Sequence, residues 1–337
     1  MKIGFQGWFL SQPFTGIGQH SLGLIKELAK KAEVTAVSPR PIKIPGVKVI
    51  VIKPKFGPLA KWYWERVQAP LAFAKLNLNL EYYPYPSPLP KKSSHKRAVT
   101  VHDLISWKDS RYAGNKIKKL YHRAAHHSLL YVDKIFTVSA AVHAELGIPN
   151  AKILPNAIPP LTSKISTKHD PNLLVYLGGY DIRKNVPELL ASFTKIQKQF
   201  PQMKLQLIGR AHHVSKYYPA LKLPPNATLL GNIPDKKVYE LLASAFAFLH
   251  FSDSEGFNIP LLQAMSLGCP AIVKDIPVNR EVSQNSALFI SPKVSTLAII
   301  KKLQDSNFRK QVSMVEKMVS KKYSWKKTAE ILLKELK

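Results

Sequence analysis

Short apolar runs alternate along this chain with longer stretches in which apolar residues recur every three or four positions. At the N-terminus an apolar run, KIGFQGWF, is followed by a glycine-bearing segment, TGIG, at 15–18. The next stretch, HSLGLIKELAKKAE, places Leu24, Ile25 and Leu28 on one helical face, and the run VTAV follows it. This order predicts a strand, a glycine loop, a helix and a second strand, which together form a βαβ unit.

The same alternation continues through the first half of the chain. Apolar runs at 48–52, 97–103 and 134–139 predict further strands, and the segment IKKLYHRAAHHSLLYV predicts a helix before the last of them. Strands that alternate with helices form a parallel sheet covered on both faces. The first half is therefore predicted to be an α/β domain.

Residues 155–172, PNAIPPLTSKISTKHDPN, interrupt this rhythm. They are rich in Pro, Ser, Thr and Lys and lack apolar periodicity, which is typical of a linker. After them a strand LLVYLGG, a helix VPELLASFTKIQKQF and a strand KLQLIG begin a second alternating series. The fold class predicted is α/β, with two domains of similar build joined by this linker.

The segment SEGFNIPLLQAMSLGCP at 254–270 combines strong helix signals with an acid. Asn258 is a good N-cap, Pro260 is tolerated in a first helical turn, and Gly268 favours the end of the helix. Glu255 lies just before this helix, where a carboxylate is a favourable partner for the helix dipole. The same carboxylate can accept hydrogen bonds from sugar hydroxyls, and Gln263 in the helix can reach a ribose.

Other candidate residues lie in loops that follow predicted strands, where ligands bind in open α/β sheets. His102 can titrate near neutral pH or donate to a substrate, or it can be a structural residue satisfied by Asp103. Arg183 and Lys184 precede a helix, where two cations and the helix-end amides can hold a diphosphate; the alternative is a solvated basic turn.

The glycines of the TGIG segment allow the backbone to approach a ligand closely near a helix N-terminus. The segment lacks the third glycine and the ribose-binding acid of the full dinucleotide fingerprint. A tight turn without a ligand explains it equally well.

Composition narrows the class of protein. The chain has 337 residues, of which 45% are hydrophobic and 21% are charged, as in globular proteins with room for two domains. The one cysteine, Cys269, excludes a disulfide framework and a cysteine-based zinc cluster. No apolar run is long enough to span a bilayer and the N-terminus is a poor secretory signal, so a cytoplasmic location is expected.

The net charge of +29 is the most unusual feature of the composition, and it favours polyanionic partners. Residues 53–66, KPKFGPLAKWYWER, interleave basic and aromatic side chains, which is typical of peripheral contact with an anionic membrane. A core-facing helix with a solvated basic face is the alternative. No recognised nucleic-acid module accompanies the charge, so nucleic acid is not the expected partner.

Taken together, the motifs resemble those of the retaining glycosyltransferases of family 4, a group 1 family with the GT-B fold that includes glycogen synthases and mannosyltransferases. The resemblance covers nearly the whole chain. Its blocks are TGIGQHSLGLIKELAK, VTVHDL, IFTVSAAVHAELGIP, ILPNAI, YLGGYDIRKNVPELLASF, GNIPDKKVYELLASA, EGFNIPLLQAMSLGCPAIV, REV and YSWKKTAEILL.

The resemblance implies two Rossmann-like domains that face each other across a cleft. An N-terminal domain at 1–160 would bind the acceptor, with a C-terminal helix at about 322–337 packed back on it. A domain at 161–321 would bind the nucleotide sugar. The implied reaction moves a hexose from a GDP-, UDP-, ADP- or dTDP-sugar to a glycan or lipid-linked acceptor, as in polysaccharide biosynthesis, and needs no metal or other cofactor.

The resemblance also implies roles for individual residues. Glu255 matches the first acid of the E-x7-E motif, near the donor sugar. Arg183 and Lys184 match the basic pair that neutralises the departing diphosphate, and His102 matches a histidine near the sugar. His102, Glu255 and Lys184 are therefore the implied catalytic residues.

The remaining implied contacts are to the donor nucleotide, mostly through the backbone. The positions assigned to the base, to the phosphates or to the ribose are Gly16, Gly18, Ile233, Phe257, Asn258, Ile259 and Gln263.

Two positions depart from the pattern of the family. Gln263 stands where the motif has its second acid, and Gly179 stands where many members have Arg. An amide can still bond ribose hydroxyls, so donor binding is expected to persist. The change at Gln263 keeps open a second hypothesis, a catalytically silent scaffold that binds sugar nucleotides.

Overall fold

The computed structural model describes residues 1–108, 110–113, 115–159, 165, 167–210 and 217–336. The chain divides into two compact units, one formed by Met1–Pro159 with Tyr323–Lys337 and the other by Pro160–Lys322. They are called unit 1 and unit 2 below. Part of the predicted linker, residues 160–164 and 166, lies outside the described residues.

Unit 1 contains a seven-stranded parallel sheet in the order β3-β2-β1-β4-β5-β6-β7. Its strands are β1 (Lys2–Gln6), β2 (Glu33–Ser38), β3 (Val47–Val51), β4 (Leu80–Tyr83), β5 (Lys96–Val101), β6 (Lys134–Thr137) and β7 (Lys152–Ile153). Its helices are α1 (Gly16–Leu28), α2 (Ala60–Tyr63), α3 (Ala69–Ala74), α4 (Ile105–Lys108), α5 (Ser110–Ala113), α6 (Lys116–His127), α7 (Ala140–Leu146) and α15 (Trp325–Glu335). A π-helical segment, η2 (Trp64–Gln68), joins α2 to α3, and short 3₁₀ turns lie at Gly57–Leu59 and Ser128–Tyr131.

Unit 2 contains a six-stranded parallel sheet in the order β10-β9-β8-β11-β12-β13. Its strands are β8 (Leu173–Leu177), β9 (Lys204–Ile208), β10 (Ala227–Gly231), β11 (Ala247–His250), β12 (Ala271–Lys274) and β13 (Leu288–Ile290). Its helices are α8 (Val186–Gln199), α10 (Asp235–Ser244), α11 (Ile259–Ser266), α12 (Pro277–Ser283), α13 (Thr296–Leu303) and α14 (Ser306–Ser320), with a 3₁₀ turn, η4, at Ile182–Lys184.

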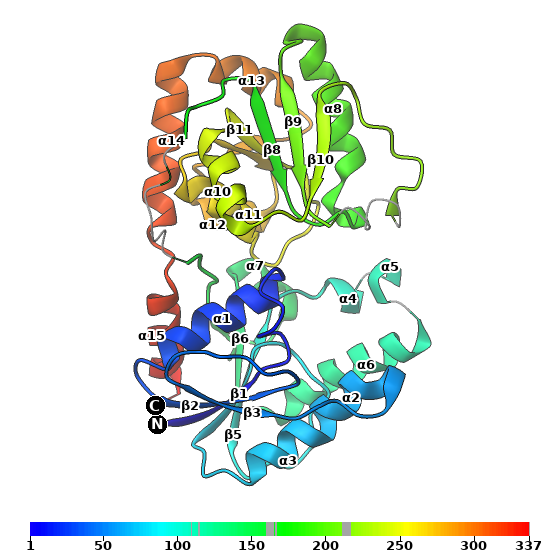
Figure 1. Cartoon of the computed structure of the whole chain (residues 1–337), viewed down its shortest axis with the longest axis vertical. Coiled ribbons are helices and arrows are strands. Elements are labelled where there is room, and N and C mark those ends of the chain that lie inside the picture. The colour runs from blue at the N-terminus through cyan, green and yellow to red at the C-terminus, as the bar shows by residue number, and fades with distance from the viewer. Residues whose placement is uncertain (109, 114, 160–164, 166, 211–216, 337) are drawn as a thin grey trace. The chain divides into compact units, whose positions relative to one another are not determined.

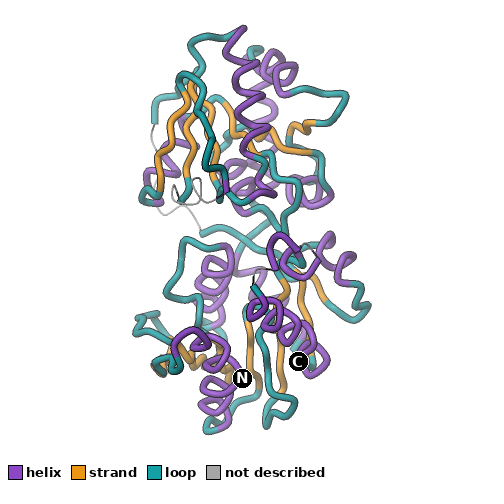
Figure 2. Tube along the Cα trace, turned by 90° about the vertical axis from the view of Figure 1, so that its right-hand side faces the viewer, coloured by secondary structure: helices purple, strands orange, loops and turns teal. Residues whose placement is uncertain are grey.

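In each unit a layer of strands lies between helices (Figures 1 and 2). The central strands β8 and β11 are buried on both faces, which explains why they are continuous apolar runs rather than alternating patterns. The α/β fold class with two parallel sheets is therefore confirmed.

The C-terminal helix α15 belongs to the core of unit 1. Trp325, Ala329 and Leu332 are buried in the same apolar cluster as residues of β1 and α1. Helix α1 allows this contact because a side chain at Gly23 would lie 2.1 Å from the Trp325 ring. The end of the chain thus closes one face of the N-terminal sheet.

Two strands are not predicted by the pattern. β4 is fully buried and pairs with β1 and β5, although it contains Glu81 and is followed by Pro84. β13 follows β12 on the edge of the second sheet, where helices were expected. The structure also corrects the glycine loop at 15–18: α1 begins at Gly16, and the Thr15 side chain caps it by accepting from the N–H of Gly18 at 3.0 Å.

Candidate functional site

The chemically most distinctive cluster in unit 2 lies where two neighbouring strands end. η4 carries Arg183 and Lys184 after β8, and Glu255 follows β11. β8 and β11 are adjacent in the sheet, and the chain reverses its strand order between them. Ligands in open α/β sheets bind at such a reversal, so this is the expected place for a site.

The Glu255 carboxylate is bonded by both cations of η4. Lys184 Nζ lies 2.5 Å from Glu255 Oε1, and Arg183 Nη1 lies 2.9 Å from Oε2. Arg183 Nη1 also donates to the carbonyl of Ser254 at 2.7 Å, and its Nε lies 3.0 Å from Asp181 Oδ1. Two cations therefore share one buried carboxylate, and the backbone of the Glu255 loop is tied to the same guanidinium.

Burial and charge act in opposite directions on these groups. Burial raises the pKa of Glu255, but attraction to Lys184 and Arg183 outweighs it and holds the pKa well below its usual range. Burial and the neighbouring Arg183 lower the pKa of Lys184, and Glu255 opposes that shift. The carboxylate is therefore ionised at neutral pH and keeps the two cations in place.

His250, the last residue of β11, lies behind this ion pair. Its ring is completely buried, with Nε2 3.5 Å from Glu255 Oε1, and it stacks on Tyr176 at a ring separation of 5.8 Å. Burial lowers the pKa of His250 to about 3, so the ring is neutral at pH 7. The sequence did not reveal this residue, because a histidine inside an apolar strand gives no signal of its neighbours.

Asn258 joins the same network and starts α11. It adopts a left-handed conformation with φ 61°, and its side chain accepts from the N–H of Leu261 at 3.2 Å. Its Nδ2 donates to Asn279 Oδ1 at 2.8 Å, which fixes the first turn of α11 against α12. The first N–H groups of a helix have no intrahelical acceptor and favour anions.

The other residues predicted in unit 2 lie along or beside α11. Phe257 and Ile259 flank Asn258 and are buried, and Ile233 is half-buried in the turn between β10 and α10. Gln263 lies on α11 with 8% of its surface exposed, and its side chain opposes the rise in the pKa of Tyr239 on α10 that burial causes. Of the residues predicted in unit 2, Arg183, Lys184 and Glu255 are therefore the ones that the structure brings into direct contact.

The remaining predicted residues, His102, Gly16 and Gly18, lie in unit 1. Gly16 is exposed at the start of α1, and Gly18 is buried, where a Cβ would lie 1.9 Å from the carbonyl oxygen of Gln12. This close approach requires glycine at 18 for a structural reason.

His102 follows β5 and is held in one tautomer. Burial lowers its pKa to about 4, so the ring is neutral at pH 7, and its Nε2 lies 2.8 Å from the carbonyl oxygen of Pro84. Because a carbonyl only accepts, the proton is on Nε2 and Nδ1 is an acceptor. His20 packs edge-on against this ring at 4.7 Å and is itself bonded to Asn156 and Tyr82.

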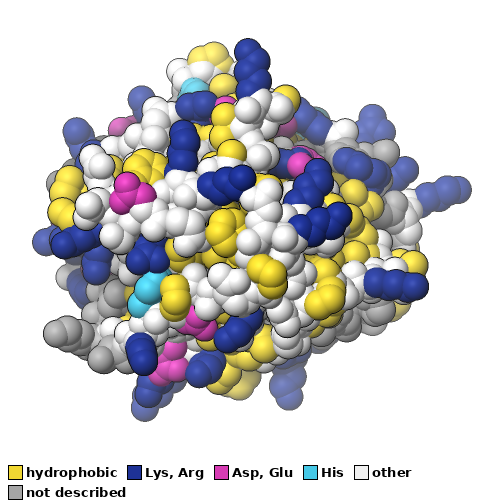
Figure 3. Space-filling view, turned by 90° about the horizontal axis from the view of Figure 1, so that it is seen from above, with side chains coloured by type: hydrophobic (Ala, Val, Ile, Leu, Met, Phe, Trp, Pro, Cys, Tyr) yellow, Lys and Arg dark blue, Asp and Glu magenta, His cyan; other side chains and the backbone are white. Residues whose placement is uncertain are grey.

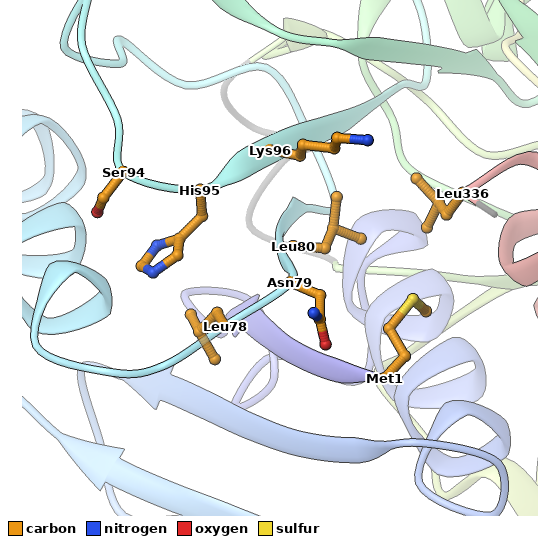
Figure 4. Close-up of a pocket in the computed structure, with 8 residues that line it drawn as sticks. All are labelled: Met1, Leu78, Asn79, Leu80, Ser94, His95, Lys96 and Leu336. Atoms are coloured by element: carbon orange, nitrogen blue, oxygen red, sulfur yellow. The ribbon is translucent and has the colours of Figure 1, made fainter.

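A surface hollow of about 630 Å³ lies elsewhere in unit 1 and is lined by Met1, Leu78, Asn79, Leu80, Ser94, His95, Lys96 and Leu336 (Figure 4). It lies at the amino ends of β1, β4 and β5, the edge of the sheet opposite to the one where ligands bind in open α/β folds. We therefore assign the site to the carboxyl ends of the strands and not to this hollow.

The described residues contain no group of three or more His, Cys, Asp or Glu side chains that could hold a metal ion. None of their helices is long and apolar enough to cross a membrane. Lys and Arg side chains are spread over the face shown in Figure 3, with few acids between them.

Comparison with known proteins identifies the second unit. Residues 160–317 match the sequence model of the family described as glycosyl transferases group 1. The serotype-specific mannosyltransferase WbdA of Escherichia coli is 29% identical over 172 residues, which are 48% of this chain and 20% of that protein. The chain thus spans about a fifth of the length of this relative.

Two further proteins extend the comparison. The O-antigen chain mannosyltransferase RfbU of Salmonella typhimurium is 28% identical over 208 residues, or 58% of this chain and 57% of that protein. The crystal structure of Anabaena Alr3699/HepE in complex with UDP and glucose superposes with a TM-score of 0.73 at 15% identity, covering 100% of this chain and 99% of that one. The whole chain accordingly has the GT-B fold with two Rossmann-like units, and the segment 160–317, which holds the Glu255 cluster, belongs to the group 1 glycosyltransferases.

Proposed function

We propose that this chain is a retaining glycosyltransferase that moves a hexose from a nucleotide-diphosphate sugar to a glycan or lipid-linked acceptor without a metal ion. The observation that carries the proposal is the contact of Arg183 and Lys184 with Glu255 at the carboxyl ends of β8 and β11. In this proposal unit 2 binds the donor and unit 1 binds the acceptor. Related proteins named as mannosyltransferases, and a neighbouring structure that contains UDP and glucose, support this type of donor and reaction.

The proposed chemistry follows from the charges of the cluster. Breaking the bond between the anomeric carbon and the diphosphate places negative charge on the diphosphate and positive charge on the sugar. Lys184, Arg183 and the N-terminus of α11 would stabilise the departing diphosphate, which is the largest electrostatic contribution expected in such a site. Glu255 would hold these cations in position and accept hydrogen bonds from sugar hydroxyls.

Retention of configuration requires the acceptor hydroxyl to attack from the face that the diphosphate leaves. In this mechanism the acceptor oxygen bonds to the anomeric carbon, the bond from that carbon to the diphosphate oxygen breaks, and the departing diphosphate takes the hydroxyl proton. His102, neutral with Nδ1 as an acceptor, would bond a hydroxyl of the donor sugar rather than supply a charge. No metal ion takes part in any of these steps.

Peripheral contact with the inner face of a membrane is a further part of the proposal. The structure corrects which side chains of 53–66 are available, because Trp64 is buried and donates to the Ile52 carbonyl. Phe56 remains 64% exposed beside Lys55, and α6 exposes Leu120 by 66% on a helix with four Lys or Arg and no acid. Apolar and basic side chains together favour anionic lipid.

Flotation with anionic and neutral vesicles tests the membrane contact. The double substitution Phe56→Ser/Leu120→Ser should reduce binding to anionic vesicles. The double substitution Met314→Ser/Met318→Ser on α14, which removes similarly exposed apolar side chains from unit 2, should not. Equal flotation with neutral and anionic vesicles would remove this part of the proposal.

The second candidate function is a catalytically silent scaffold that binds sugar nucleotides, and Gln263 in place of the motif acid favours it. Incubation with GDP-, UDP-, ADP- and dTDP-hexoses and a panel of glycan acceptors separates the two, with mass spectrometry of the products. Transfer in the presence of EDTA, with the donor's anomeric configuration kept in the product NMR spectrum, supports the enzyme. Tight nucleotide binding without transfer, and transfer restored by Gln263→Glu, would instead support the scaffold.

A further inference from the structure

The sheet of unit 1 has a strand-order reversal of its own. β2 and β3 lie on one side of β1, and β4 lies on the other. The carboxyl ends of β1 and β4 are therefore the place in unit 1 where an open α/β sheet binds ligands. Trp8 and Phe9 follow β1, and Tyr85 follows β4 by two residues.

Lys61 of α2 reaches into a group of aromatic rings at this edge. Its Nζ lies 4.9 Å from the ring centroids of Tyr85 and Tyr121, 5.2 Å from that of Phe9 and 5.9 Å from that of Trp8. These rings come from three separate parts of the chain, and Tyr121 is supplied by α6, which runs beside α2 (Figure 1). The Lys61 side chain keeps 35% of its surface exposed.

Glu65 lies behind the ammonium group and is completely buried. Its Oε2 accepts from the Tyr121 hydroxyl at 2.6 Å, its Oε1 accepts from the Tyr85 hydroxyl, and Lys61 Nζ lies 3.5 Å from Oε1. Burial of a carboxylate is costly unless it is hydrogen-bonded and paired. A lysine and a glutamate one helical turn apart can form an ion pair on the surface of a helix without burial of the carboxylate. Burial of Glu65 and its bonds to two tyrosines are therefore not needed for the stability of the helix.

The cluster is continuous with His102, a predicted site residue in unit 1. Gln6, the last residue of β1, donates to the Tyr85 hydroxyl at 2.8 Å. The carbonyl of Pro84, the residue before Tyr85, accepts from His102. One backbone segment therefore positions both the aromatic cluster and the histidine predicted to lie near the sugar.

We propose that Lys61, Trp8, Phe9 and Tyr121 form a subsite for a sugar ring of the acceptor. The apolar face of the ring would pack on the partly exposed aromatic side chains, and its hydroxyl oxygens would accept from the Lys61 ammonium. Glu65 is a positioning residue that fixes Lys61 and Tyr121. The identity of the ligand as an acceptor rests on the proposed glycosyltransferase function.

Saturation-transfer NMR on the full chain tests the subsite, with a mannose trisaccharide and maltotriose as probes in the absence of donor. The substitution Lys61→Met keeps most of the aliphatic stem and should weaken binding of the better probe at least about 10-fold, the size expected for a lost charged hydrogen bond. Glu65→Gln keeps the shape of the side chain and should weaken it less. The matched control Lys75→Met, an exposed lysine at the end of α3, should bind as the wild type does.

Calorimetric titration with nucleoside diphosphates separates this proposal from the proposed function. Lys61→Met should leave nucleotide affinity within about twofold of wild type and, where transfer occurs, should raise the KM for the acceptor more than it lowers kcat. If the wild type bound no nucleotide, the donor site would be refuted, and saturation transfer to the sugars would be unaffected. If neither sugar showed saturation transfer, or if Lys61→Met and the wild type showed equal saturation transfer, the subsite would be refuted.

Discussion

The substitution Glu255→Gln gives a direct measure of the buried charge cluster in unit 2. It removes the carboxylate that both Lys184 and Arg183 contact and changes the side-chain volume little. Lys184 is only 6% exposed, so its ammonium group would remain buried without the charge that now lies 2.5 Å away. The glutamine oxygen can still accept one hydrogen bond, which offsets part of the loss.

Removing one partner of a buried ion pair costs about 3–5 kcal/mol, and the remaining hydrogen bond places Glu255→Gln near the lower end, at about 3 kcal/mol. Unit 2 spans Pro160–Lys322. For a domain of that size each 1 kcal/mol shifts Tm by about 2–4 °C, so the expected decrease is about 6–12 °C at pH 7.

The difference should depend on pH in a defined direction. The pKa of Glu255 in the folded state lies well below its usual range, so the unfolded state binds more protons as the pH falls. The contribution of the carboxylate is complete above the unfolded pKa of about 4.3 and is lost as the pH falls towards the folded pKa. The gap between wild type and Glu255→Gln should therefore be constant from pH 7 to about pH 5 and shrink below about pH 4.

The assay can be made specific to each unit, because all five tryptophans lie outside unit 2, at Trp8, Trp62, Trp64, Trp107 and Trp325. Calorimetry should show the decrease in the transition of unit 2, and tryptophan fluorescence should show an unchanged transition of unit 1.

The control is Glu188→Gln in the same unit, whose carboxylate is 45% exposed and lies 2.6 Å from Lys274 Nζ. An exposed pair contributes about 0–1 kcal/mol, so this variant should shift Tm by a few degrees at most. Equal stability of the Glu255→Gln and Glu188→Gln variants would refute the reasoning.

Three further outcomes are expected from contacts in the two units. Lys184→Ala should lower the rate of sugar transfer at least about 10-fold, as for loss of a charge-stabilising contact, and unchanged kcat in a steady-state assay would contradict the assignment. Gly23→Ala should detach α15, because the new methyl group would meet the Trp325 ring at 2.1 Å; faster proteolysis of the C-terminus is the readout, and wild-type resistance would argue against it. His250, with a pKa of about 3, should show no titration of its ring protons between pH 5 and 8 in NMR spectra, and a midpoint near 6.5 would show that the ring is not buried beside the ion pair.

The sequence predicts the α/β class and most strands because buried parallel strands are continuous apolar runs with a clear boundary at each end. The pattern does not predict β4, because β4 contains Glu81. The Glu81 carboxylate is buried and accepts hydrogen bonds from Tyr83, Ser93 and Arg97. A charge that finds its partners within the core cannot be distinguished in the sequence from a charge in a loop.

The candidate site shows the same limit. Arg183 and Lys184 stand out by their position before a helix, and Glu255 by its position before another. Their direct contacts, however, join residues 72 and 71 positions apart. Lys61 and Glu65 are separated by four residues and could be predicted to pair, whereas the Tyr121 hydroxyl comes from 56 residues away. Local spacing therefore suggests which groups are reactive, and only the tertiary structure shows which of them share a site.

Binding of a nucleotide-diphosphate sugar to the Glu255 cluster is the claim on which the account depends. Calorimetric titration of the full chain with GDP-, UDP-, ADP- and dTDP-hexoses, repeated on Lys184→Ala, measures it without an acceptor. The account predicts that at least one of these donors binds and that the substitution weakens it about 10-fold or more, as expected for a lost charged hydrogen bond. Binding of equal strength to the wild type and Lys184→Ala, or no binding of any of the four donors, would contradict it.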